Sequence, residues 1–287
     1  MKKVLFKLLY ILAILVLLAI FVGCFWKLGA YFLEGKQTQD AYNDLSDLVQ
    51  QARPSEGPTD TTLDWSALQT IPDEQIATMP DSPYIPVTDP ETGTVTYLLP
   101  EFKDLYAINP DVVGWISIPG TSIDYPVVQS KDRTDCYLYR DFYGNDASRG
   151  CIYAREQCDV FKPSDNIVLY GHMMKDGTMF ADLANYTSKE YWQEHQTIQF
   201  DTLKARHTYQ IICVFRTTAS AGEGFPYHLF VDAEYDSDLD DFWDNCRKNA
   251  YYDTGLSLRY GDKLITLSTC EYTQVNGRLV IVAKRID

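Results

Sequence analysis

The feature that most constrains this chain is a run of nineteen residues without a charge, Leu8 to Trp26. Lys2, Lys3 and Lys7 precede this run, and Lys27 follows it. A helix of that length spans the hydrocarbon core of a bilayer. A cleavable signal peptide has a shorter apolar segment and a small-residue cleavage site, which "KLGAYF" matches poorly. We therefore predict an uncleaved transmembrane helix.

The position of the basic residues predicts how this helix is oriented. They cluster at the extreme N-terminus, so the positive-inside rule leaves that end in the cytoplasm. We expect a single-pass protein of the cell membrane whose later residues lie outside the cell. A weaker alternative is the stretch "FVGC" ending at Cys24, which resembles a lipoprotein cleavage site. Either interpretation keeps the protein on the membrane.

Beyond the anchor the chain is strongly acidic. Residues 1–27 contain four Lys and no acidic residue, and the remainder contains 21 basic and 40 acidic side chains, a net charge of −19. Such a surface repels the phosphate backbone of nucleic acids. We therefore expect no nucleic acid partner.

Seven cysteines are present, which is an odd number. Five remain when Cys24 and Cys270 are set aside, and no C-x-x-C pair occurs. Zinc sites are typically built from such pairs, so we expect no metal, and we expect no cofactor. We interpret most of the five as buried thiols. They are Cys136, Cys151, Cys158, Cys213 and Cys246.

Local composition and hydrophobic pattern divide the chain into three parts. Residues 1–29 form a cytoplasmic stub and the transmembrane anchor. Residues 30–100 form an extracytoplasmic region with a helix and a Pro-rich spacer. Residues 101–287 form the main folded domain, where short β-rich runs replace the polar, Pro-rich sequence of the spacer.

The middle part predicts two kinds of structure. Within 34–52, Tyr42, Leu45, Leu48 and Val49 recur at helical spacing, which indicates a short amphipathic helix. Residues 54–90 then hold seven of the thirteen prolines, which favours an extended spacer.

The main domain reads as mainly β with helical insertions. Around eight short runs alternate with turns and favour an antiparallel barrel or sandwich. Helical insertions are predicted near 176–195 and at 236–252. In the second, Leu239, Phe242, Trp243 and Cys246 share one face. The strand-like runs are "VVGWISI", "DYPVVQ", "GCIYA", "NIVLY", "TIQFDT", "HTYQIICVFRT", "DKLITLST" and "RLVIVAKRI".

Cys270 ends the apolar run "KLITLSTC", and two pairings with the next strand fit the sequence. If Asn276 and Gly277 form a two-residue turn, Cys270 faces Ala283. If residues 271–277 form one loop, Cys270 lies beside Arg278 at the strand start. The second pairing makes chemical sense, because a thiol near a permanent cation is more readily ionised.

A nucleophilic cysteine needs a proton partner, and the chain has four histidines. His172 follows the strand "NIVLY" in a loop before a helical stretch, where functional side chains are commonly held. We therefore select His172. We interpret His195, His207 and His228 as solvated or structural.

Three separated motifs resemble those of the sortases, the cysteine transpeptidases of Gram-positive cell surfaces. They are "YGHMMKDGTMFADL" (170–183), "TLSTC" (266–270) and the arginine in "NGRLVIVAKRI" (276–286). The resemblance extends to residues 108–129 and covers roughly 101–287. The sequence "STCEY" and the long helix predicted before the strand of Cys270 look most like those of class B sortases.

This resemblance implies an eight-stranded sortase β-barrel behind an N-terminal transmembrane helix. It implies that Cys270, His172 and Arg278 are catalytic. We expect Thr269 or a nearby backbone amide to assist Arg278, and Tyr272 to line a peptide groove unless it is ordinary barrel packing.

The resemblance also implies an activity and its partners. The enzyme is expected to cleave a C-terminal sorting signal of secreted proteins after Thr and to transfer the thioacyl intermediate. The acceptor is expected to be an amine on a peptidoglycan precursor or a pilin. The alternatives are a pilin-polymerising sortase, a hydrolytic cysteine peptidase, and a non-enzymatic adhesion or scaffold domain.

Overall fold

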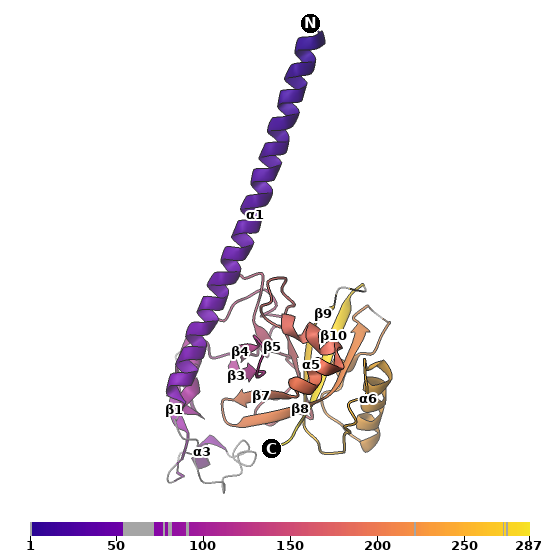
Figure 1. Ribbon diagram of the computed structural model, residues 1–287. Helices are drawn as coiled ribbons and strands as arrows, with labels where there is room; N and C mark the ends of the chain where they lie inside the picture. Colours follow the sequence, from indigo (N-terminus) through magenta and orange to yellow (C-terminus); the bar gives the residue numbers. More distant parts are fainter. Residues whose placement is uncertain are drawn as a thin grey trace. The chain divides into compact units, whose positions relative to one another are not determined.

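The computed structural model describes residues 2–53, 72–76, 78–79, 82–89, 92–220, 222–271, 273 and 275–287 (Figure 1). These residues fall into two compact units that divide between Ala41 and Tyr42. The first unit is helical, and the second contains the strands of the described chain.

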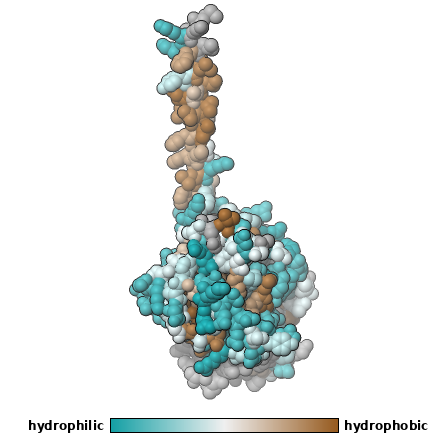
Figure 2. All heavy atoms as spheres, turned by 90° about the vertical axis from the view of Figure 1, so that its right-hand side faces the viewer, coloured by the Kyte–Doolittle hydropathy of each residue, from teal (hydrophilic) through white to brown (hydrophobic). Residues whose placement is uncertain are grey.

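Helix α1 (Lys2–Ala52) contains the apolar run and continues well beyond it. Its apolar stretch lies within Phe6–Ala52, where an 18-residue window has a mean hydropathy of 3.0 and no buried residue. Figure 2 shows hydrophobic residues along most of this stretch on the visible face. The helix is therefore long and apolar enough to cross a membrane.

The predicted helix within 34–52 is not a separate element, because it is the end of α1. Residues 27–52 contain no proline, and Gly29 and Gly35 do not interrupt the helix. Its predicted apolar face is confirmed. Tyr42, Leu45 and Val49 belong to the second unit and are buried within it.

The predicted spacer falls partly on residues 54–71, which lie outside the described residues. Its later part contains regular structure rather than an extended chain. The short helix α3 (Asp73–Ile76) is followed by β1 (Ile85–Thr88) and β2 (Val95–Leu98), which pair as an antiparallel hairpin. The 3₁₀ helix η1 (Pro100–Phe102) and helix α4 (Lys103–Ile108) lead into the main sheet.

The main sheet closes into a barrel with the strand order β10-β8-β7-β3-β4-β5-β6-β9. The expected eight-stranded barrel is therefore confirmed, and the sandwich is excluded. The strands are β3 (Val112–Ser117), β4 (Asp124–Val128), β5 (Ile152–Ala154), β6 (Asn166–Tyr170), β7 (Thr197–Thr202), β8 (Arg206–Thr218), β9 (Leu264–Glu271) and β10 (Gly277–Arg285).

The barrel is not wholly antiparallel, which corrects the sequence-based expectation. The pairs β4–β5 and β6–β9 are parallel. Parallel neighbours need a long crossover connection, and residues 129–151 and 171–263 supply one to each pair. The β6–β9 pair brings the ends of two strands, far apart in sequence, to one edge of the barrel.

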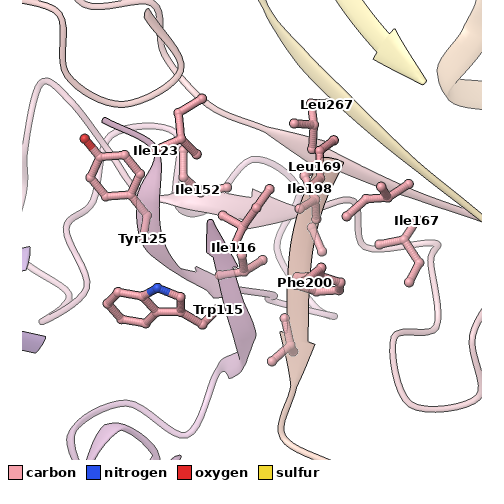
Figure 3. Packing of buried hydrophobic residues seen from close by; sticks show 14 of the residues in the cluster. Trp115, Ile116, Ile123, Tyr125, Ile152, Ile167, Leu169, Ile198, Phe200 and Leu267 are labelled. Atoms are coloured by element: carbon pink, nitrogen blue, oxygen red, sulfur yellow. The ribbon is translucent and has the colours of Figure 1, made fainter. Parts of the chain in front are cut away.

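Alternating apolar side chains of these strands fill the core (Figure 3). Strand β9 is buried on both faces: Ile265 and Leu267 join the main core cluster, whereas Leu264 joins a second cluster beneath a helix. Members of the main cluster labelled in Figure 3 are Trp115, Ile116, Ile123, Tyr125, Ile152, Ile167, Leu169, Ile198, Phe200 and Leu267.

Both predicted helical insertions are present. The first consists of the 3₁₀ helix η2 (Ala181–Thr187) and helix α5 (Lys189–Glu194). The second is α6 (Asp236–Asn249), and its predicted apolar face is buried against β8. At its start the Asp238 carboxylate accepts the backbone N–H of Tyr235 at 2.9 Å, which satisfies one end group of the helix. A further 3₁₀ turn, η3 (Tyr227–Leu229), precedes it.

Candidate active site

The hairpin of β9 and β10 settles the pairing that the sequence left open. Arg278 lies directly opposite Cys270, and Gly277 lies opposite Glu271. Because the pairing ends at Glu271 and Gly277, a two-residue turn at Asn276 and Gly277 is excluded. Asn276, just before β10, adopts a left-handed φ of 52°, a conformation that Asn tolerates. The second of the two predicted pairings is therefore confirmed, with the thiol and the guanidinium side chain on facing residues.

His172 reaches the same edge because β6 runs parallel to β9. Tyr170 pairs with Ser268, and the N–H of Gly171 continues the ladder to the carbonyl of Ser268 at 3.2 Å. A side chain at Gly171 would meet Ile152 at 2.5 Å, so this close approach requires glycine. Two residues beyond the paired Tyr170, His172 therefore lies at the same edge of the barrel as Cys270, which is the second-last residue of β9.

The imidazole of His172 is held by a backbone carbonyl. Its Nε2 lies 2.8 Å from the carbonyl oxygen of Leu138, and its ring centroid lies 5.6 Å from that of Tyr139. Since a carbonyl oxygen only accepts, Nε2 carries a proton in this arrangement. Nδ1 is then the nitrogen that is free to exchange a proton with another group.

The three residues line one open cavity of about 280 Å³. Thr269 also lines it, but its buried Oγ1 has no hydrogen-bond partner among the described residues. Tyr272 lies outside the described residues. The cavity thus brings together four of the five residues that the sequence analysis selected.

The guanidinium of Arg278 has backbone partners only, within the described chain. It donates to the carbonyl of Gly277 at 3.0 Å and lies at 3.5 Å from that of Asn276. Most of its five N–H donors therefore remain available to a ligand in the cavity.

The structure adds residues that sequence reasoning missed. Tyr227 and His228 of η3 line the cavity, and the Tyr227 hydroxyl lies 2.5 Å from Ser268 Oγ. Burial raises the pKa of Tyr227, while the Ser268 contact and the charge of Arg278 act in the opposite direction. Burial also lowers the pKa of His228, and the charges of Arg155 and Arg278 add to this effect. The only sequence signal for these residues was their Gly/Pro-rich loop.

The remaining histidines and cysteines lie elsewhere. His195 stacks on Tyr191, and His207 is buried beside Asp287. Cys151, Cys158, Cys213 and Cys246 are buried free thiols, as predicted. Cys136 and Cys270 are partly exposed, and Cys24 is exposed.

Comparison with known proteins agrees with this geometry. Residues 116–286 match the family model described as "Sortase domain". Sortase B of Staphylococcus aureus is 33% identical over 192 residues, which cover 66% of this chain and 76% of the relative. Sortase B of Listeria monocytogenes is 33% identical over 188 residues, which cover 65% of this chain and 74% of the relative.

The similarity extends to solved structures. That of a Staphylococcus aureus sortase B–substrate complex superposes with a TM-score of 0.67 at 28% identity, covering 89% of this chain and 99% of that one. The chain therefore belongs to the sortase family of cysteine transpeptidases, and within it is most similar to the class B enzymes.

Proposed function

We propose that this enzyme cleaves a C-terminal sorting signal after Thr and transfers the acyl group to an amine, using Cys270, His172 and Arg278. One observation supports the proposal above others. The β6–β9 and β9–β10 registers bring these three residues to a single cavity at the barrel edge. The solved substrate complex of a class B relative supports a peptide as the ligand.

In the first step the Cys270 thiolate attacks the threonine carbonyl carbon, and a carbon–sulfur bond forms. The carbon–nitrogen bond then breaks, and the departing amine takes a proton from the imidazolium of His172. Because Nε2 is held by Leu138, the proton leaves from Nδ1. The product is a thioester on Cys270.

In the second step an acceptor amine attacks the thioester carbonyl carbon. His172, now neutral, takes a proton from the attacking amine, the carbon–sulfur bond breaks and Cys270 is regenerated. Both steps place negative charge on the carbonyl oxygen. Arg278 stabilises that charge with its available N–H donors, and Thr269 assists it at the same edge.

We further propose that α1 anchors the enzyme in the cell membrane, with its N-terminus in the cytoplasm and the barrel outside. The basic residues before the apolar run support this orientation. Secreted sorting-signal proteins and a membrane-linked peptidoglycan amine meet at that surface. The enzyme is thus proposed to attach surface proteins to the cell wall.

Product analysis tests the transfer step. The full-length enzyme in detergent is incubated with a threonine-containing sorting peptide, with and without a glycine-based amine. A transpeptidase forms the amide with the amine and little free acid. Release of free acid at the same rate, with no amide formed, identifies a hydrolytic peptidase instead, and no cleavage at all favours the scaffold interpretation.

Arg278→Lys tests the role of the guanidinium. Lysine keeps the charge but replaces the planar fork by a point charge, so turnover is expected to fall. Unchanged turnover removes Arg278 from the catalytic set.

A further inference from the structure

The carbonyl group that holds His172 lies in a connection without regular secondary structure. Residues 129–151 join β4 to β5, and all of them are described, but they contain no helix or strand. The carbonyl oxygen of Leu138, within this connection, lies 2.8 Å from His172 Nε2. Its position must therefore be determined by contacts with other parts of the chain.

The later part of the same connection holds the Leu138 carbonyl in place. The N–H groups of Cys151 and Ala147 donate to the carbonyls on either side of Leu138, at 3.0 and 2.9 Å. Gly150 approaches so closely that a Cβ there would lie 2.4 Å from the Leu138 oxygen. Residues 147–151 therefore determine where that oxygen lies.

Tyr42, in the last part of α1, holds this segment from the other side. Its buried hydroxyl donates to the carbonyl of Gly150 at 3.0 Å and lies 3.3 Å from Cys151 Sγ. The hydroxyl has one proton, which goes to the carbonyl, so the thiol donates to the phenol oxygen. Burial raises the pKa of the Cys151 thiol to about 12, so the thiol keeps the proton that this bond needs. The two bonds hold consecutive residues of the segment.

The ring of Tyr42 reaches a second support of the site. It packs edge-to-face against Tyr125, with the ring centroids 5.3 Å apart. The Tyr125 hydroxyl accepts the N–H of Met179 at 3.0 Å. Met179 is buried with a left-handed φ of 59° and pairs with Met173, the residue after His172. Tyr42 therefore also supports the loop that carries the imidazole.

Both contacts of Tyr42 lead to His172 and to no other member of the proposed catalytic set. Tyr42 is not one of the residues that line the active-site cavity. Cys270 and Arg278 are held by the pairing of β9 with β10 instead. A displacement of about 1 Å in a catalytic group can cost about 100-fold in rate. Loss of the Tyr42 hydroxyl should therefore affect proton transfer by the imidazole and leave the thiol in place.

We infer that Tyr42 is a positioning residue for proton transfer by His172, and that the end of α1, residues 42–52, is thereby part of the support of the active site. The inference rests on the proposed function. Because α1 is continuous from Lys2 to Ala52, the residue that supports the imidazole belongs to the same helix as the apolar run. Efficient acylation then requires that residues 42–52 stay packed on the barrel.

Substrates with different leaving groups separate the contribution of His172 from the rest of the site. The departing amine of a peptide needs a proton, whereas the thiolate that departs from a matched thioester does not. Acylation of Cys270 is measured by intact-protein mass at saturating substrate, with the full-length enzyme in detergent. The substrates are a sorting peptide and the same peptide with a thioester at the threonine carbonyl. His172→Ala calibrates the assay and is expected to lose far more rate with the peptide than with the thioester.

Two variants that each remove one buried hydroxyl separate positioning from stability. Tyr42→Phe keeps the ring on Tyr125, and its rate is expected to fall at least about tenfold with the peptide but less than about twofold with the thioester. Its thioester rate also reports how much enzyme is folded. Tyr84→Phe is the matched control, because the buried Tyr84 donates to the carbonyl of Lys204 at 2.7 Å and neither residue lines the cavity. It should lower Tm, as Tyr42→Phe does, and leave both rates unchanged.

An unchanged peptide rate in Tyr42→Phe, or an equal loss with both substrates, overturns the inference. A selective loss in His172→Ala then leaves the proposed function intact. An absent or unselective loss in His172→Ala contradicts the proton transfer assigned to His172, and the inference with it.

Discussion

Gly150 determines where the carbonyl group that holds His172 can lie, so Gly150→Ala is expected to disturb the site through the backbone. Gly150 has a φ of +57°, and a Cβ there would lie 2.4 Å from the carbonyl oxygen of Leu138. That oxygen is the partner of His172 Nε2 at 2.8 Å. The alanine methyl group therefore cannot be accommodated unless the Leu138 carbonyl moves.

The magnitude follows from two contributions. A left-handed backbone conformation costs a non-glycine residue about 1–2 kcal/mol. Relieving a clash in a packed region costs about another 1–3 kcal/mol. We expect the free energy of unfolding to fall by roughly 3 kcal/mol, which lowers Tm by about 6–12 °C in a domain of this size.

Gly144→Ala is the matched control, because Gly144 has a φ of +83° and no atom lies within 4 Å of the position that the alanine methyl group would take. It carries the conformational strain without the clash, so Tm should fall by only about 2–8 °C. Thermal unfolding and the rate of acylation by a sorting peptide are measured for both variants. Equal Tm shifts, with equal acylation rates, refute the reasoning that Gly150 controls the Leu138–His172 contact.

Three further predictions concern titration, thiol reactivity and a buried ion pair. The lowered pKa of His228 means that the unfolded chain takes up its proton first, so stability is lost as the pH falls below about 6.5. His228→Asn should flatten that loss in urea denaturation at pH 7.5 and 5.5; an unchanged difference contradicts the assignment. Burial raises the pKa of the Cys151 thiol to about 12, so iodoacetamide at pH 8 should modify Cys270 in the folded enzyme and leave Cys151 unmodified. Modification of both at similar rates, read by peptide mass, argues against this. Asp176→Asn removes the carboxylate paired with the fully buried Arg149 and should cost about 3 kcal/mol of unfolding free energy, whereas a change below about 0.5 kcal/mol is incompatible with the ion pair.

Much of the fold follows from local pattern. The apolar face of α6 was predicted residue by residue, because burial of one face repeats at helical spacing. The strand count was predicted from alternation and turns. The facing of Cys270 and Arg278 was one of two registers that the sequence pattern allows, and the chemistry of a thiol beside a permanent cation favoured it.

Other features depend on which strands become neighbours in the sheet. The alternation of side chains along a strand shows which residues share a face, but it does not show which strand pairs with which. The parallel β6–β9 pair, which explains why His172 lies at the same barrel edge as Cys270, was therefore not foreseen. Arg155 was missed for a similar reason. In "IYARE" it resembles a surface charge after a strand, and only the tertiary structure shows that it lines the active-site cavity.

The central claim is that Cys270 is the nucleophile, and intact-protein mass after incubation with a sorting peptide tests it most directly. The wild type is predicted to gain the mass of the peptide up to its threonine, mapped to Cys270 and lost on treatment with hydroxylamine. Cys270→Ala is predicted to gain no mass. Acylation of Cys270→Ala, or of another cysteine in the wild type, contradicts the account.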